Sequence, residues 1–151
     1  SGRMSFTQAF VSSWYISFIQ NKTFETMKLL GLAPMLWTKH LSLTVGFYTN
    51  ILKFKCDELN EEIGWASLSR DHIQIMLAVP KNHPEFKEAQ LTGSIYIYTD
   101  DVEKLWKELK DKVEVVYPID NFEYGMREFA IYDNNKYMLQ FGQEIDLSKI
   151  G

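Results

Sequence analysis

The sequence predicts an α+β fold of two tandem modules, each made of one strand, one helix and three more strands. The first observation is an internal similarity: residues 64–77 read GWASLSRDHIQIML and residues 124–141 read YGMREFAIYDNNKYMLQF. Both stretches contain a Gly followed by a large apolar residue, alternate through an Asp, and end near Met-Leu. The second observation is an amphipathic helix pattern before each stretch, so one order of elements occurs twice, over about fifty residues each time. Two such modules can form a curved mixed sheet around a cleft, with the helices outside.

Residues 1–26 are predicted to be an extension ahead of the modules. The opening residues SGRMS resemble a remnant of cloning, and the apolar run that follows is too short and too interrupted to cross a bilayer. A helix is expected in this extension, packed on the domain or on a partner subunit, because large apolar residues recur every four positions: Phe6, Phe10, Trp14 and Phe18. In an alternative interpretation, Met27 is the natural start of the protein.

The first module is predicted to span residues 27–80. Its helix is expected over about 41–53, because apolar residues follow one another at helical spacing there. Two alternating runs joined around Asp71 are typical of a hairpin. The four strands of this module are predicted at 32–37, 54–59, 65–70 and 72–79.

The stretch PKNHPEFKEAQ, residues 80–90, has two prolines and many charges, and it predicts a linker over the surface at residues 81–91. The second module follows at 92–144, with a tail at 145–151. Its helix is expected within DDVEKLWKELKDK, where an Asp can cap the first turn and apolar residues form one stripe. Strands are predicted at 93–99 and at 113–118, the latter ending at Pro118 before a loop, and a hairpin at 126–132 and 137–142 turns through DNNK.

Composition limits the possible partners and the cellular location. The net charge is −4 and no run of basic residues occurs, which argues against nucleic acid as a partner. The apolar share of 46% and the aromatic share of 15% suffice for a packed interior and a lined pocket. Cys56 is the only cysteine, so no intrachain disulfide can form; we interpret it as an inert strand residue in a cytoplasmic protein without a membrane anchor.

Three stretches carry a resemblance to a known family. They are FYTNILKF at the end of the first helix, YTDDVEKLWKEL at the second helix and YGMREFAIYDNNKYMLQFG near the end of the chain. Over residues 28–144 the chain resembles the glyoxalase/bleomycin resistance protein/dioxygenase superfamily, with its vicinal oxygen chelate fold. The chain is most similar to the bleomycin-resistance-like branch. It departs from the family's usual Asp-Pro-Asp-Gly turn, which is DNNK here. The resemblance implies a homodimer whose cleft holds either a divalent metal or an organic ligand.

The residues at the family's metal positions do not favour a metal. The resemblance maps the ligands of the first and last strand of each module onto Ala33, Ser94 and Gln140, and onto Gln74 or Met76. Divalent metals of this family need carboxylate or imidazole donors, which these residues lack. The histidines show no ligand spacing, since they fall at a helix start, a hairpin turn and the linker: His40, His72 and His83. We therefore expect no metal and no other cofactor.

Strand alternation predicts which side chains face the cleft. It predicts a wall of aromatic rings and neutral amides around one charge, Glu128, which suits an aromatic or cationic ligand. The predicted ligand-binding residues are Trp37, Trp65, Gln74, Tyr96, Tyr98, Glu128 and Gln140. Packing of these rings against each other or in a dimer contact is an equally open interpretation. Phe122 and Tyr124 either cap the pocket or lie over the core.

Three functions are consistent with these features. The first is a metal-free binding protein that sequesters a small molecule without turnover, since no nucleophile with its base and hence no catalytic residue is recognised. The alternative is a metal-dependent lyase, isomerase or ring-cleaving dioxygenase of the same superfamily. The third is a structural or regulatory dimer whose cleft has closed.

Overall fold

The computed structural model describes residues 30–81 and 86–146. The chain divides into two units, Ser1–Gly31 and Leu32–Gly151, and all of the secondary structure described lies in the second. The expected N-terminal helix falls outside the described residues. Within them, no helix is long and apolar enough to span a membrane.

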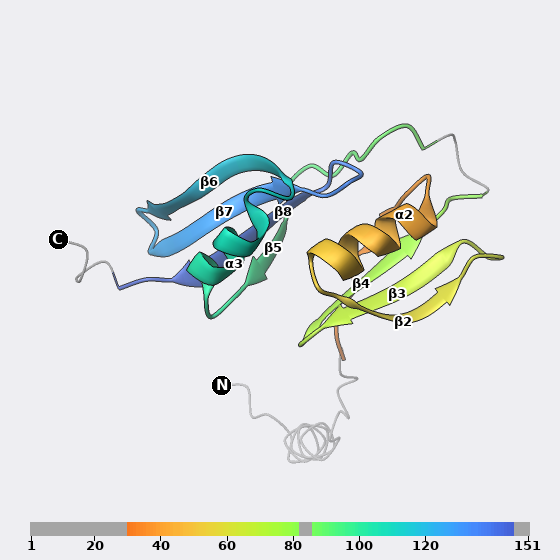
Figure 1. Cartoon of the computed structure of the whole chain (residues 1–151), viewed down its shortest axis with the longest axis horizontal. Helices are drawn as coiled ribbons and strands as arrows, with labels where there is room; N and C mark the ends of the chain where they lie inside the picture. Colours follow the sequence, from red (N-terminus) through yellow and green to blue (C-terminus); the bar gives the residue numbers. More distant parts are fainter. Residues whose placement is uncertain (1–29, 82–85, 147–151) are drawn as a thin grey trace, which may run out of the picture. The chain divides into compact units, whose positions relative to one another are not determined.

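The first module forms a four-stranded sheet with one helical segment on it (Figure 1). The strand order is β1-β4-β3-β2, with β1 parallel to β4 and the other neighbours antiparallel. This arrangement confirms the predicted order of elements. The elements are β1 (Met35–Trp37), α2 (Leu41–Gly46), the π-helix η1 (Phe47–Ile51), β2 (Lys55–Asn60), β3 (Trp65–Arg70) and β4 (Ile73–Ala78).

The predicted helix over about 41–53 changes type along its length. It is α-helical only to Gly46 and then widens into η1, where the amide of Leu52 bonds the carbonyl of Phe47 at 3.3 Å. Such single wide turns place side chains where a regular α-helix would not. Here the wide turn contains Tyr48, which is fully buried.

The second module repeats the first, with strand order β5-β8-β7-β6 and β5 parallel to β8. Asp101 caps its helix as expected, since its side chain accepts the Lys104 amide at 3.0 Å. Pairings among the described strands stay within each module, so the chain has two mixed sheets. The elements are β5 (Ile95–Tyr98), α3 (Val102–Leu109), β6 (Glu114–Phe122), β7 (Met126–Tyr132) and β8 (Met138–Glu144).

One strand prediction in this module is wrong. The strand expected to end at Pro118 continues as β6 to Phe122, where a loop was predicted. A proline is tolerated there because β6 is at the end of the sheet and its pairing with β7 is irregular. The register shifts on both sides of Tyr117, between Val115 and Tyr117 and again before Asp120.

Each helix covers one face of its own sheet and leaves the other face open. Strand alternation accounts for this division, because every second residue of a central strand is apolar and buried under the helix. The most buried of these residues are Leu68, Ile75 and Leu77 in the first sheet and Phe129, Ile131 and Leu139 in the second. The open face of the second sheet carries the site described below.

The β7–β8 turn joins the two modules. Asp133, which is 3% exposed, accepts the Tyr48 hydroxyl at 2.9 Å and the backbone amide of Asn135 at 2.8 Å. The Asn135 side chain donates to Thr44 Oγ1 at 3.0 Å and accepts from Thr38 Oγ1 at 3.1 Å. The DNNK turn therefore does more than reverse the chain, because its side chains fill hydrogen-bond positions inside the first module.

Candidate functional site

A buried carboxylate lies at the centre of the open face of the second sheet. Glu128 of β7 is only 1% exposed. Its Oε2 accepts the Tyr96 hydroxyl at 2.5 Å, and its Oε1 accepts the hydroxyls of Tyr117 and Tyr124, each at 2.8 Å. Gln140 Nε2 donates to Tyr117 Oη at 2.6 Å and, more weakly, to Glu128 Oε1 at 3.4 Å. We call these five residues the Glu128 cluster.

Sheet register explains why these side chains meet. Tyr96 of β5 lies beside Gln140 of β8, and Glu128 of β7 lies beside Gly142 of β8. Tyr96 must reach over β8 to bond Glu128, and Gly142 leaves the space for it. A Cβ atom on Gly142 would overlap the Tyr96 hydroxyl. A side chain of any size at this position would therefore disturb the cluster.

The hydrogen bonds determine the protonation states of the cluster. Burial by itself raises the pKa of the Glu128 carboxyl, but the hydroxyls of Tyr96, Tyr117 and Tyr124 and the Gln140 amide outweigh it and hold that pKa below its usual value. Burial, together with the bond to Glu128, raises the pKa of the Tyr117 hydroxyl to about 12 and raises the pKa of Tyr96 as well. At neutral pH the cluster is thus one carboxylate surrounded by neutral phenols.

Aromatic rings surround this charge. The Tyr96 and Tyr98 ring centroids are 5.1 Å apart, and Phe122 stacks on Tyr124 at 5.3 Å and meets Tyr117 at 5.8 Å. Tyr98 is 71% exposed and Tyr124 is 65% exposed, so the rings are accessible while the carboxylate is covered. We call these five rings the tyrosine face.

Four of the seven predicted ligand-binding residues lie together on this sheet: Tyr96, Tyr98, Glu128 and Gln140. The other three belong to the first module. Trp65 is half-buried in β3, and Gln74 of β4 donates to Ser67 Oγ at 3.2 Å. The ring of Trp37, at the end of β1, packs edge-on against Phe86 at 6.3 Å and lines a separate hollow of about 590 Å³ beside the linker.

Sequence reasoning missed Tyr117 and Gly142 as parts of the site. Tyr117 was assigned to a strand without a direction, because the irregular register of β6 breaks the alternation that predicts one. Gly142 gave no signal apart from being a glycine inside a strand pattern, which often marks a close approach of another group. Strand alternation also turns Ser94 toward this face, where its hydroxyl donates to Gln140 Oε1.

Two modules of one strand, one helix and three strands, each with an open sheet face, define the class of protein to which the chain belongs. The chain is a member of the Glyoxalase/Bleomycin resistance protein/Dioxygenase superfamily, whose family model matches residues 32–141. The comparison with curated proteins found no match.

Solved structures of this superfamily resemble the chain at low sequence identity. A member from Sphaerobacter thermophilus has a TM-score of 0.66 at 16% identity, covering 78% of this chain and 100% of that chain. A glyoxalase/bleomycin resistance protein/dioxygenase from Nocardioides has a TM-score of 0.65 at 14% identity, covering 93% and 97%. A lactoylglutathione lyase from Agrobacterium tumefaciens has a TM-score of 0.60 at 15% identity, covering 78% and 96%. At these identities the similarity establishes the fold alone.

The donor set does not fit the divalent metal that enzymes of this superfamily can hold. The resemblance maps Ser94 and Gln140 to metal-ligand positions, but these two side chains bond each other. The Gln140 amide oxygen already accepts a hydrogen bond from the Ser94 hydroxyl. Its amide nitrogen points at Tyr117 and Glu128. In residues 30–81 and 86–146, no group of three or more His, Cys, Asp and Glu side chains could hold a metal ion. Carboxylate and imidazole donors are what such ions prefer.

Proposed function

We propose that this protein binds a planar, cationic aromatic small molecule on the tyrosine face and does not turn it over. The observation that carries the proposal is the buried, ionised Glu128 beneath exposed phenol rings. The face of an aromatic ring attracts cations, by roughly 0.5–2 kcal/mol per contact. The Glu128 charge adds to this attraction and is held in place by its own hydrogen bonds.

The state of Glu128 supports binding over catalysis. A general base works best when its pKa lies near the working pH. The pKa of Glu128 is lowered instead, and both of its oxygens already accept hydroxyl groups. Glu128 is therefore better suited to attract a charge than to move a proton. The similarity to a lactoylglutathione lyase is one of fold and does not transfer that activity.

Two further expectations belong to this proposal. We expect a homodimer, because large apolar side chains are exposed on the described surface, among them Leu59 in β2 and Ile63 in the turn that follows β2. Light scattering after size exclusion would measure its mass. A cytoplasmic location remains a prediction from the single cysteine.

The proposed function is tested by titrating the protein with ethidium, a planar cation, and measuring the heat of binding by calorimetry. Fluorescein, which is planar and anionic, is the charge control. We expect ethidium to bind and fluorescein to bind much more weakly. Tyr98→Ala should weaken ethidium binding about 2- to 30-fold, the factor that corresponds to one cation–ring contact. Tyr98→Phe keeps the ring and should bind like the wild type.

Leu43→Ala is the matched surface control, because Leu43 is 69% exposed on the helix of the other module. It should leave ethidium affinity unchanged. Equal binding of both dyes, or a Tyr98→Ala variant with wild-type affinity, would contradict the proposal. Stoichiometric metal in the purified protein, found by elemental analysis, would favour the enzymatic alternative.

A further inference from the structure

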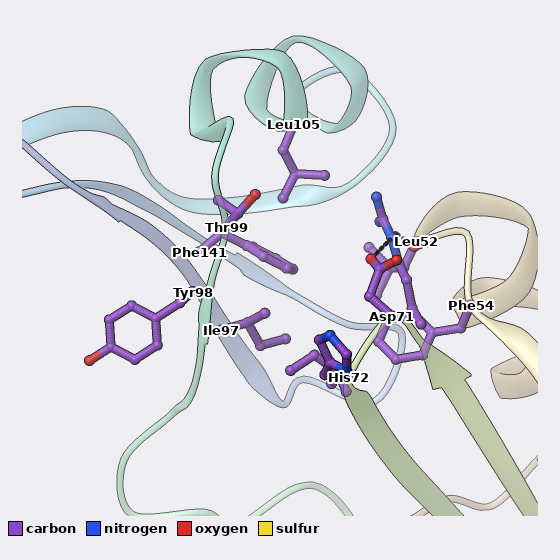
Figure 2. A pocket seen from close by; sticks show the side chains of 11 residues that line it. Leu52, Phe54, Asp71, His72, Ile97, Tyr98, Thr99, Leu105 and Phe141 are labelled. Carbon is purple, nitrogen blue, oxygen red and sulfur yellow. Dashed lines mark hydrogen bonds and ion pairs between the residues drawn. The ribbon is translucent and has the colours of Figure 1, made fainter.

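A hollow lies where the two modules meet (Figure 2). Its volume is about 170 Å³. Eleven residues line it: Leu52, Phe54, Arg70, Asp71, His72, Ile73, Ile97, Tyr98, Thr99, Leu105 and Phe141. Neither the sequence predictions nor the proposed function uses this hollow, which we call the junction cavity.

The walls of the junction cavity are apolar and come from both modules. Leu52 and Phe54, just after η1, are buried in the first module. Ile97, Leu105 and Phe141, from β5, α3 and β8, are buried in the second. Figure 2 shows Leu105 reaching from its helix toward the cavity. These side chains belong to the hydrophobic core, so the cavity is a gap in well-packed apolar surface.

The junction cavity and the tyrosine face share one residue, Tyr98, but its ring belongs only to the tyrosine face. Ile97 is buried on the helix side of β5, and its neighbours Tyr96 and Tyr98 point to the other side because strand side chains alternate. Figure 2 shows the Tyr98 ring directed away from the cavity. A molecule in the junction cavity would therefore not touch the phenol groups of the Glu128 cluster.

Four lining residues are polar or charged and lie close to solvent. They are Arg70 at the end of β3, Asp71 and His72 in the β3–β4 turn, and Thr99 just after β5. Asp71 and His72 are exposed, so this side of the cavity faces solvent. Arg70 Nη1 donates to the Leu52 carbonyl at 2.7 Å, which fixes the guanidinium at the edge. The Asp71 side chain is 85% exposed. A ligand would thus have an apolar body inside and its polar substituent at this hydrated rim.

We propose that the junction cavity is a second ligand site, for a small neutral aromatic ring with one polar substituent, such as a phenol. An apolar cavity of about 150 Å³ lined by Leu, Ile and Phe in another protein binds benzene. The junction cavity has the same kind of lining and a similar volume of about 170 Å³. It therefore has room for a single ring and not for a large planar dye. Its affinity for so small a ligand is modest, with a Kd on the order of 1 mM.

Fluorine NMR with 4-fluorophenol as the probe tests this site directly. We expect a saturable change of the fluorine signal on titration with the full chain. In methyl-labelled protein, we expect nuclear Overhauser effects from the ring to Ile97 and Leu105. Effects only to methyl groups that do not line the cavity, or no saturable binding up to the solubility of the probe, would overturn the proposal.

Two substitutions in the cavity should act in opposite directions. Leu105→Trp places a larger side chain in the cavity and should weaken 4-fluorophenol binding at least roughly ten-fold. Ile97→Ala enlarges the cavity and should admit a fluoronaphthol, which the wild type excludes. Leu43→Trp, on an exposed helix position, is the control and should bind like the wild type. Unchanged 4-fluorophenol binding by a folded Leu105→Trp protein would contradict the assignment.

The outcome is independent of the proposed function. Saturating ethidium should leave the 4-fluorophenol signal unchanged, because the two sites lie on opposite sides of the second sheet. Displacement of 4-fluorophenol by ethidium would place the probe on the tyrosine face and overturn the second site. If ethidium does not bind, the Overhauser effects to Ile97 and Leu105 still decide the question.

Discussion

The Gly142 backbone shows how strongly single residues constrain the tyrosine face. Gly142→Ala would place a methyl group on the Tyr96 hydroxyl, so the ring must move and its bond to Glu128 is lost. We expect the free energy of unfolding to fall by about 1–3 kcal/mol, as measured by urea unfolding. Gly46→Ala is the control, since its nearest new contact is Asn50 Nδ2 at 3.7 Å and helices favour Ala. A Gly142→Ala protein as stable as the wild type would show that Tyr96 moves without cost.

The phenol groups around Glu128 should lose their protons at a higher pH than ordinary tyrosines do. The pKa of Tyr117 is raised to about 12 and that of Tyr96 is raised too, whereas a tyrosine in an unfolded chain has a pKa of about 10. The stability contributed by these neutral phenols is complete below pH ~10 and is lost as the pH rises through the folded pKa values. In absorbance at 295 nm, we expect part of the tyrosine signal to change only above pH ~11.

Glu128→Gln removes the negative charge and should move part of this late titration to lower pH. Tyr48 is the internal reference, because its pKa is raised in a different place by burial and by Asp133. Its late titration should persist in the variant. A wild-type protein whose eight tyrosines all titrate together near pH ~10 would contradict the hydrogen bonds to Glu128.

Alternation predicts single residues well only where strands are regular. Tyr96, Glu128 and Gln140 were placed on one face from their positions in regular strands, and the structure brings them into one hydrogen-bonded cluster. Tyr117 lies between two register shifts of β6, where the two-residue period is lost, so sequence reasoning gave it no direction. Tyr117, which completes the cluster, therefore lies where the alternation of the strand breaks down.

At the scale of elements, the sequence predicted the order of strands and helices but not their irregularities. Helical spacing continues through η1, so the change from α- to π-helix after Gly46 leaves no trace in the periodicity. Pro118 indicated a strand end, but at the edge of a sheet the missing amide costs no pairing and β6 continues. In both cases the place of the segment in the folded protein, and not its local sequence pattern, determined its secondary structure.

The β7–β8 turn gives a prediction at this scale. Asn135→Ala removes the two side-chain hydrogen bonds to Thr38 and Thr44, whose side chains are fully buried. We expect a loss of about 1–3 kcal/mol in the free energy of unfolding, because buried hydroxyl groups lose a partner. Asn50→Ala, at an exposed position in η1, is the control and should change stability by less than about 0.5 kcal/mol. Equal stability of the two variants would show that the turn is only a connection.

At the scale of the whole molecule, the sequence could not predict the contacts between residues that are far apart along the chain. Tyr48 and Asp133 are 85 residues apart, and Trp37 and Tyr137, whose hydroxyl accepts the Trp37 amide, are 100 residues apart. The resemblance to a family predicts two modules, but neither this resemblance nor periodicity predicts which side chains form hydrogen bonds between them. The junction cavity depends on the same long-range placement, and so it too follows only from the structure.

These contacts predict that the two modules unfold together. Tyr48 is fully buried in the first module, and its hydroxyl bonds Asp133 of the second, so opening either module breaks buried hydrogen bonds of the other. We expect one calorimetric transition for the wild type, with equal calorimetric and van't Hoff enthalpies. The double variant Tyr48→Phe with Asn135→Ala should separate the modules, so that the calorimetric enthalpy exceeds the van't Hoff value.

Hydrogen exchange should show the same separation, with the amides of β3 and β4 opening at a different free energy from those of β7 and β8. Tyr132→Phe is the matched control, because it keeps the ring contact with Lys136 and no hydrogen bond of the Tyr132 hydroxyl is present among the described residues. It should keep the single transition of the wild type. If the double variant also unfolds in one step, with both sheets exchanging at one free energy, apolar packing at the junction and not the turn couples the modules.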